Sequence, residues 1–265
     1  MLKSEPDSLP MRIEQGELQS GRIYLPCVID GQERWLHLDT GSNYTSVPDD
    51  EFFGRYRVVG QRKTTGASGI SKMRDEIQAE IFRFGSMSLN QKKLVRYPHS
   101  ANQEPRLGMD VLAGKLLKID FKKRRLTFEQ SIPNELSSYP IKAEVNGQIS
   151  MAVRIAGIQT QALWDTGAEI SVGDEKLINA HPSEFSFLQE IDNGLDATGE
   201  PVKFKLYEFK NLKMGDFSIN GRMMAMDFAT VRSQVGHDIQ ILLGFNLIQL
   251  KTWHLDLLNF RWAGT

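Results

Sequence analysis

The sequence predicts an all-β protein built from two similar halves. Short segments in which apolar residues alternate with polar ones, or form brief apolar runs, are typical of strands. They recur through the 265 residues, for example at Arg22–Leu25, Trp35–Leu38 and Leu116–Phe121. A long helical pattern is not evident in the sequence, and one short helix is expected directly after Gly108 and another after Gly244.

The two halves are recognised by a repeated motif. Gly31 lies eight residues before the Asp-Thr-Gly at 39–41, and Gly157 lies eight residues before the Asp-Thr-Gly at 165–167. Each motif follows an apolar, strand-like segment, and each glycine lies where a hairpin turn is expected. The spacing indicates that one structural unit occurs twice.

A second pair of landmarks supports this interpretation. Two apolar residues precede Gly244, Leu107 precedes Gly108, and an aspartate follows each glycine after twelve residues, at Asp120 and Asp256. Four landmarks in the same order, twice, indicate a tandem duplication of about 125 residues.

The duplication divides the chain into two lobes. We expect an N-terminal lobe of residues 1–130 and a C-terminal lobe of residues 131–265, joined by the segment 129–140, which is rich in turn-forming residues. Two packed, mostly antiparallel lobes related by a pseudo-twofold axis follow from this division.

Composition excludes several classes of function. Thirty-two basic and 33 acidic residues give a net charge of −1, so neither nucleic acid nor an anionic membrane is expected as the main partner. The sequence has no apolar run long enough for a membrane span. The single cysteine, Cys27, excludes an internal disulfide and a Cys-based zinc site, and a small buried apolar role is expected for it.

The compartment is left open by the sequence. The first ten residues are polar, include two prolines and have no apolar core typical of a signal peptide, so they are expected to form a loose lead-in. A cytoplasmic protein fits this start, and so does a periplasmic or secreted one from which a targeting segment has been removed.

The repeated Asp-Thr-Gly carries a specific chemistry. An apolar strand brings a carboxylate to the edge of a core, glycine allows a sharp turn, and the threonine hydroxyl can fix that turn. Two such turns related by a pseudo-twofold axis bring Asp39 and Asp165 together. Two carboxyl groups in contact share a proton, so that one is a base for water and the other an acid for a carbonyl.

These residues resemble the pepsin and retropepsin superfamily of aspartic peptidases. The matching segments are 39–42, 165–169 and the apolar-Gly stretches ending at Gly108 and Gly244, and together they span about residues 28 to 257. The resemblance implies two retropepsin-like or pepsin-like lobes in a single chain, a cleft between them that holds a polypeptide substrate, and peptide-bond hydrolysis without metal or cofactor. Since one chain supplies both lobes, a monomer is expected.

The resemblance also implies roles for neighbouring residues. Thr40 and Thr166, with Gly41 and Gly167, are expected to brace the two loops, and Glu169 is expected to contact the substrate backbone. The residues expected to bind substrate are Ser42, Ala168 and Glu169 beside the two motifs, and Thr65, Gly66, Gly69, Thr198 and Gly199 in two Gly-rich hairpin tips.

The difference between Ser42 and Ala168 gives a further hypothesis. A hydroxyl that donates to a carboxylate favours its charged form. If Ser42 donates to Asp39, that carboxyl carries the charge and Asp165 carries the proton. His37, two residues before Asp39 on the same expected strand, is interpreted as a core or interface histidine.

Two functions remain open on the same fold. The first is an aspartic endopeptidase in which Asp39 and Asp165 activate one water molecule, with either general activity or a single native protein target. The alternative is a catalytically silent peptide-binding module, because duplicated folds can lose activity and retain binding.

Overall fold

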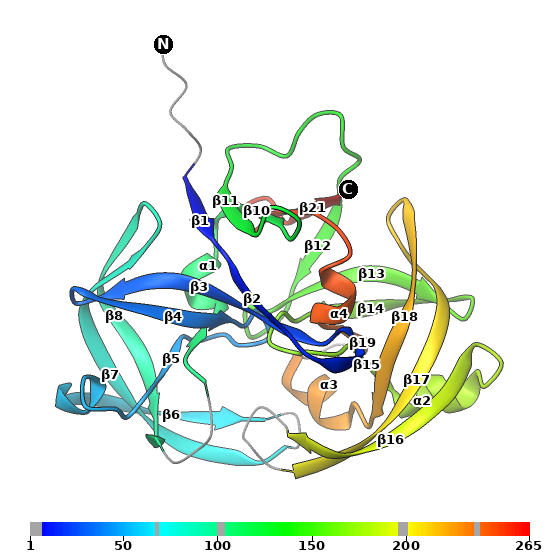
Figure 1. The fold of residues 1–265 in the computed structure, drawn as a ribbon, viewed down its shortest axis with the longest axis horizontal. Coiled ribbons are helices and arrows are strands. Elements are labelled where there is room, and N and C mark those ends of the chain that lie inside the picture. The colour runs from blue at the N-terminus through cyan, green and yellow to red at the C-terminus, as the bar shows by residue number, and fades with distance from the viewer. Residues whose placement is uncertain (1–6, 67–68, 100–103, 196–200, 236–238) are drawn as a thin grey trace.

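The computed structural model describes residues 7–66, 69–99, 104–195, 201–235 and 239–265 (Figure 1). Strands form most of this part of the chain, and the longest helix within it, α3 (Ala229–Val235), has seven residues. The expected all-β class is therefore confirmed.

Among the described residues, one sheet has eight strands, all from the first half of the chain. In their order across the sheet they are β2 (Arg12–Gln15), β3 (Gly21–Ile29), β4 (Gln32–Leu38), β9 (Arg106–Leu107), β5 (Ser46–Pro48), β8 (Met87–Tyr97), β7 (Ser71–Phe84) and β6 (Val58–Thr65).

The other sheet has thirteen strands among the described residues and draws on both halves. In order they are β1 (Ser8–Pro10), β11 (Arg125–Phe128), β10 (Leu116–Asp120), β20 (Trp253–Asp256), β21 (Arg261–Gly264), β12 (Tyr139–Ala143), β13 (Ile149–Ile155), β14 (Ile158–Trp164), β19 (Ile239–Leu243), β15 (Val172–Asp174), β18 (Phe217–Met226), β17 (Pro201–Met214) and β16 (Phe185–Leu195). The short helices are η1 (Glu17–Gln19), η2 (Phe53–Arg55), α1 (Met109–Leu112), α2 (Glu175–Ala180), α3 and α4 (Phe245–Ile248).

Local expectations from the sequence agree with these elements. Gly31 and Gly157 occupy the β3–β4 and β13–β14 turns with φ of +85° and +77°, a region that glycine enters without steric cost. Helices α1 and α4 follow Gly108 and Gly244 as predicted. A Cβ atom at Gly108 would meet the backbone of Tyr44, so the loop after Asp39 packs directly on this glycine.

The predicted loose lead-in is wrong in part. Residues 8–10 form β1, which pairs antiparallel with β11, Ser8 lying opposite Thr127. Arg125 fixes this short edge strand, because its Nε donates to Ser8 Oγ at 2.7 Å. The pairing could not be read from 8–10 alone, because it depends on a partner strand more than a hundred residues away.

The two halves repeat the same strand pairings around their Asp-Thr-Gly motifs. Strand β4 runs parallel to β9, which is antiparallel to β5, which is parallel to β8. In the second half, β14, β19, β15 and β18 are paired in the same directions. The duplication seen in the sequence is therefore also present in the topology.

One strand pair joins the halves directly. Strands β10 and β20 are antiparallel, with Lys118 opposite His254. These two residues correspond to each other when Gly108 is matched to Gly244, so the pairing centres on equivalent positions. In Figure 1, β10, β11 and β21 lie in the upper middle, between the two groups of long strands, and β6 and β16 lie at the bottom.

A buried aromatic group lies behind the second motif. Trp164, which directly precedes Asp165, packs edge-on against Trp253 with 4.6 Å between ring centroids, and Trp253 lies 5.6 Å from Trp262. All three side chains are at most 1% exposed. Their burial anchors the end of β14 against the strands that join the halves.

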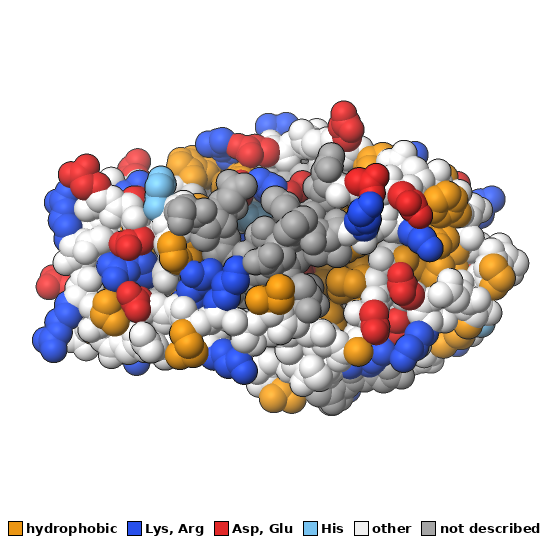
Figure 2. All heavy atoms as spheres, turned by 90° about the horizontal axis from the view of Figure 1, so that it is seen from below, with side chains coloured by type: hydrophobic (Ala, Val, Ile, Leu, Met, Phe, Trp, Pro, Cys, Tyr) orange, Lys and Arg blue, Asp and Glu red, His pale blue; other side chains and the backbone are white. Residues whose placement is uncertain are grey.

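The outer face seen from below is mixed in charge. Lys and Arg side chains are interspersed with Asp and Glu over the described part of this face (Figure 2). This distribution agrees with the near-neutral net charge of the chain.

Candidate active site

Each motif aspartate directly follows the last residue of a strand whose end is buried. Asp39 follows β4 and its N–H donates to Leu107 O at 3.0 Å, whereas Asp165 follows β14 and its N–H donates to Leu243 O at 2.9 Å. Because β9 and β19 hold these strand ends in the same way, both aspartates leave their sheets with equivalent backbone anchoring.

The two threonines cross-link the loops. Thr40 Oγ1 donates to Trp164 O at 2.9 Å and accepts from the Thr166 N–H at 3.0 Å. Thr166 Oγ1 donates to Leu38 O at 2.7 Å and accepts from the Thr40 N–H at 3.1 Å. Both side chains are buried. Four reciprocal hydrogen bonds therefore fix one loop against the other, which the sequence alone could suggest only through the family resemblance.

The motif glycines lie against the carboxyl group of the opposite loop. A Cβ atom at Gly41 would stand 2.5 Å from the carboxyl atoms of Asp165, and one at Gly167 would overlap the carboxyl of Asp39. Each carboxyl therefore reaches across to the other motif, and only a residue without a side chain leaves it room. The two predicted acids are brought to one place.

The pKa of Asp165 is raised to about 7. Burial is the largest cause, because it disfavours the charged form, and the neighbouring Asp39 acts in the same direction. Backbone N–H groups of Gly167 and Gly41 oppose this by hydrogen bonding, the first at 2.8 Å from Asp165 Oδ1, and so does the charge of Arg106. Asp165 is thus the member of the pair that retains a proton towards neutral pH.

An arginine is the main feature that sequence reasoning missed. Arg106 Nη1 lies 3.3 Å from Asp39 Oδ2, and the Asp39 side chain is only 8% exposed. A cation beside a carboxyl group favours its charged form. The available signal was the comparison of the two halves, because Arg106 stands where the second half has Leu242.

The predicted hydrogen bond from Ser42 to the Asp39 carboxylate is wrong. Its hydroxyl donates to Tyr44 O at 2.8 Å and accepts from the Tyr44 N–H at 3.4 Å, so its single proton is used within the loop. Ser42 holds the turn after Asp39, and Arg106 is the group that interacts with the Asp39 carboxylate. Ala168 serves as a backbone acceptor, since its carbonyl receives the Phe245 N–H at 2.8 Å.

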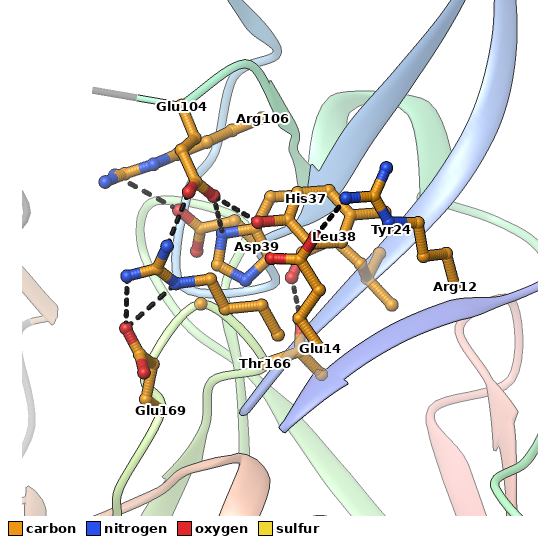
Figure 3. Close-up of polar contacts among 12 residues, drawn as sticks. Arg12, Glu14, Tyr24, His37, Leu38, Asp39, Glu104, Arg106, Thr166 and Glu169 are labelled. Carbon is orange, nitrogen blue, oxygen red and sulfur yellow. Dashed lines mark hydrogen bonds and ion pairs between the residues drawn. The ribbon is translucent and has the colours of Figure 1, made fainter. Parts of the chain in front are cut away.

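Charged side chains form a network next to Asp39 (Figure 3). Glu104 accepts from Arg22 Nη1 at 2.5 Å and from the Tyr24 hydroxyl at 2.7 Å, and lies 4.0 Å from His37 Nδ1. Arg22 also donates through Nε to Glu169 at 2.8 Å. Glu169, expected to contact substrate, is thus held by an ion pair that connects β3 of the first half to the second motif.

Burial lowers the pKa of the histidine in this network. His37 is 4% exposed, and burial lowers its pKa, although the Asp39 charge works in the opposite direction. Its position in β4 fits the predicted core role, and the sequence spacing from Asp39 places it on the same face of the strand.

The position of the second half that corresponds to Arg22 also contacts the opposite half. Gln148 precedes Asp165 by the same 17 residues that separate Arg22 from Asp39, and its Nε2 donates to the carbonyl of Gly41. Arg22 reaches the segment after the second motif and Gln148 reaches the first motif. Each half therefore contacts the Asp-Thr-Gly segment of the other half.

The first Gly-rich tip closes β6 onto β7 and reaches the second half. The Gly66 N–H donates to Ile70 O at 3.1 Å, and Thr65 Oγ1 lies 2.9 Å from Ser71 Oγ. Gln234 Nε2 of α3 donates to Gly66 O at 3.4 Å. A Cβ at Gly69 would stand 3.2 Å from Thr230 Oγ1. The other predicted tip residues, Thr198 and Gly199, lie outside the described residues.

Other groups in the described residues give no competing site. Cys27 is buried and its pKa is raised by that burial, which fits the apolar role expected for it. The described part of the chain has no cluster of three His, Cys, Asp or Glu side chains that could hold a metal ion. Within the same residues, no helix has the length and apolar character needed to cross a bilayer.

Comparison with known proteins leaves the site to be interpreted from its own geometry. Neither a protein-family model nor a curated protein matches this sequence.

Proposed function

We propose that this chain is an aspartic endopeptidase of the pepsin and retropepsin type. The observation that carries the proposal is the mutual placement of the two motifs: each carboxyl lies on the glycine of the other loop, and Thr40 and Thr166 hold the loops together. Such an arrangement places two carboxyl groups where they can act on one water molecule.

The electrostatics assign different roles to the two acids. Arg106 Nη1 lies 3.3 Å from Asp39 Oδ2, and burial raises the pKa of Asp165, which supports Asp39 as the base and Asp165 as the acid. Asp39 accepts a proton from water as the water oxygen bonds to the scissile carbonyl carbon, and Asp165 donates its proton to the carbonyl oxygen. The intermediate is a tetrahedral diol.

Collapse of the diol completes the reaction. The C–N bond breaks as its nitrogen takes the proton held by Asp39, and Asp165 regains a proton from a hydroxyl group of the diol. The products are a carboxylic acid and an amine, and both aspartates return to their starting states. Both proton transfers of this step are made by Asp39 and Asp165.

The bilobal arrangement of the family forms part of the proposal. The repeated pairings around β4 and β14, and the β10–β20 junction centred on equivalent residues, support two lobes of residues 1–130 and 131–265 related by a pseudo-twofold axis. The β6–β7 tip of the first half contacts α3 of the second half, which supports a role for Gly66 and Gly69 in covering a bound polypeptide.

The test is cleavage of denatured casein between pH 3 and 8, with and without pepstatin, by the full chain and by Asp39→Asn and Asp165→Asn. We expect pepstatin-sensitive cleavage by the unaltered chain, and a loss of about 10²–10⁴-fold in each variant. Cooperative thermal unfolding of both variants is the control for folding. Binding of unfolded polypeptide without cleavage at any pH would favour the silent peptide-binding module instead.

A further inference from the structure

The residue five positions after the motif aspartate differs between the halves. It is Tyr44 in the first half and Ile170 in the second. The two backbones lie in equivalent places, because a Cβ atom at Gly108 would stand 2.5 Å from the carbonyl carbon of Tyr44, and one at Gly244 would stand 2.7 Å from that of Ile170. The first half therefore has an aromatic ring and a hydroxyl group where the second half has an aliphatic side chain.

The ring of Tyr44 faces the β6–β7 hairpin. The guanidinium carbon of Arg62, on β6, lies over this ring, 5.7 Å from its centroid. Arg62 is held in place from β7, because its Nε donates to Oε1 of the buried Glu76 at 2.8 Å. A cation over the face of an aromatic ring is attracted to it. The Tyr44 ring thus contacts a side chain whose position the hairpin itself fixes.

The hydroxyl group of Tyr44 interacts with the same strand. Thr64 follows Arg62 by two residues, so both side chains leave the same face of β6. Burial raises the pKa of Tyr44, and a hydrogen bond with the Thr64 side chain and the charge of Asp39 also act on it. Thr64 Oγ1 donates to Lys72 O at 3.1 Å, across the hairpin. Both ends of the tyrosine side chain therefore contact β6.

Tyr44 thereby connects two parts of the proposed site. Its backbone belongs to the loop after Asp39, where Ser42 Oγ donates to the Tyr44 carbonyl at 2.8 Å. Thr64 lies two residues before Gly66, which is proposed to help cover a bound polypeptide. The loop that carries one aspartate and the strand that leads into the hairpin tip are thus joined by a single side chain.

We infer that Tyr44 is a positioning residue, which holds the β6–β7 hairpin in place relative to the Asp39 loop and so sets how closely the hairpin lies over a bound polypeptide. This inference rests on the proposed peptidase function and adds the residue that holds its covering element. Tyr44 itself makes and breaks no bond. A contact that favours the bound substrate and the transition state alike affects KM rather than kcat.

The first measurement is the kinetics of cleavage of one synthetic peptide, chosen from a casein digest made by the unaltered chain. Tyr44→Ile introduces the residue of the second half, and Tyr44→Phe keeps the ring but removes the hydroxyl. We expect KM to rise about tenfold in Tyr44→Ile and about threefold in Tyr44→Phe. In both variants kcat should stay within about twofold. Ile170→Val is the matched control and should change neither constant by more than about twofold.

The second measurement does not need activity. Backbone hydrogen exchange is followed by mass spectrometry on the full chain without substrate. Tyr44→Ile should accelerate exchange in peptides from the β6–β7 hairpin by about tenfold and leave the β3–β4 hairpin unchanged. Arg62→Gln should have a similar effect, and the two changes together should add little, because they remove the same contact. Arg62→Gln and Tyr44→Phe keep the test available if Tyr44→Ile does not fold.

The outcomes separate the two proposals. Unchanged exchange in the β6–β7 hairpin of Tyr44→Ile, or a fall in kcat with KM unchanged, would overturn the positioning inference and leave the peptidase intact. Absence of cleavage by the unaltered chain would overturn the peptidase proposal. The exchange measurement alone would then decide whether Tyr44 holds the hairpin.

Discussion

Arg106 Nη1 lies 3.3 Å from Asp39 Oδ2. In the second half, the position that corresponds to Arg106 is occupied by Leu242, which carries no charge. Two nearly equivalent loops are therefore made electrostatically unequal by one side chain. The charge of Arg106 also reaches the second aspartate, because it lowers the pKa of Asp165.

Arg106→Leu should move the alkaline limb of the pH–activity profile upward. The Arg106 charge lowers the pKa of Asp165, so its removal raises that pKa further and lets Asp165 keep its proton to higher pH. A displacement of about one pH unit in kcat/KM is expected. Arg106→Lys retains the charge and should leave the limb in place. A limb that moves downward in the leucine variant would contradict this account.

Stability should depend on pH through Asp165. Its pKa is higher in the folded protein than the usual aspartate value, so the folded state binds the proton more tightly. That contribution is complete below about pH 4, the usual aspartate pKa, and is lost as pH rises through about 7. Asp165→Asn removes the titrating group.

The measurement is urea unfolding of both proteins at pH 4 and pH 8. Relative to the unaltered chain, Asp165→Asn should be more stabilising, or less destabilising, at pH 8 than at pH 4. Asp256→Asn serves as the comparison for a buried aspartate outside the site. An equal difference at the two pH values would show that Asp165 does not titrate as assigned.

Thr40→Ala should destabilise the protein by about 1–3 kcal/mol. The change leaves the buried Thr166 N–H and Trp164 carbonyl without their partner. Thr40→Ser retains the hydroxyl and should recover most of the loss. Chemical denaturation gives the free energies, and a double-mutant cycle with Thr166→Ala should show coupling, because both hydroxyls support the same pair of loops. If the free-energy losses of the two variants simply added, the two hydroxyls would stabilise the protein independently of each other.

Cys27 should play no part in catalysis. It lies on β3 and is 2% exposed, and burial raises the pKa of its thiol, so little reactive thiolate forms at neutral pH. We expect Cys27→Ala to retain casein cleavage and a thiol reagent to react with the unaltered chain only after denaturation. Rapid labelling with loss of activity in the folded protein would point to a different nucleophile.

The local pattern of residues accounts for much of the fold. Strands around Trp35 and Leu116, turns at Gly31 and Gly157, and the helices after Gly108 and Gly244 all follow from periodicity and from glycine geometry. The basic residues 122–124 lie in the turn between β10 and β11. These features depend on residues close together in the chain.

The unpredicted features depend on long-range pairing. The sequence predicts a loose segment at 8–10 because the strand that pairs with these residues, β11, is distant in sequence. Arg106 comes close to Asp39 only through the β4–β9 register. The acceptor of the Ser42 hydroxyl cannot be predicted from sequence, because a hydroxyl can rotate between a carboxylate and a local carbonyl, and the turn around Tyr44 decides between them.

The β10–β20 junction has a consequence for the separated halves. Each half, produced alone, would leave one of these strands with an open edge, and such edges recruit other strands. Because Lys118 pairs with its own counterpart, His254, a first half could offer its β10 edge to another first half in the same register. A fragment ending near residue 130 should therefore self-associate through this edge. The association should be weaker than the β10–β20 pairing, because two Lys118 side chains would face and repel each other.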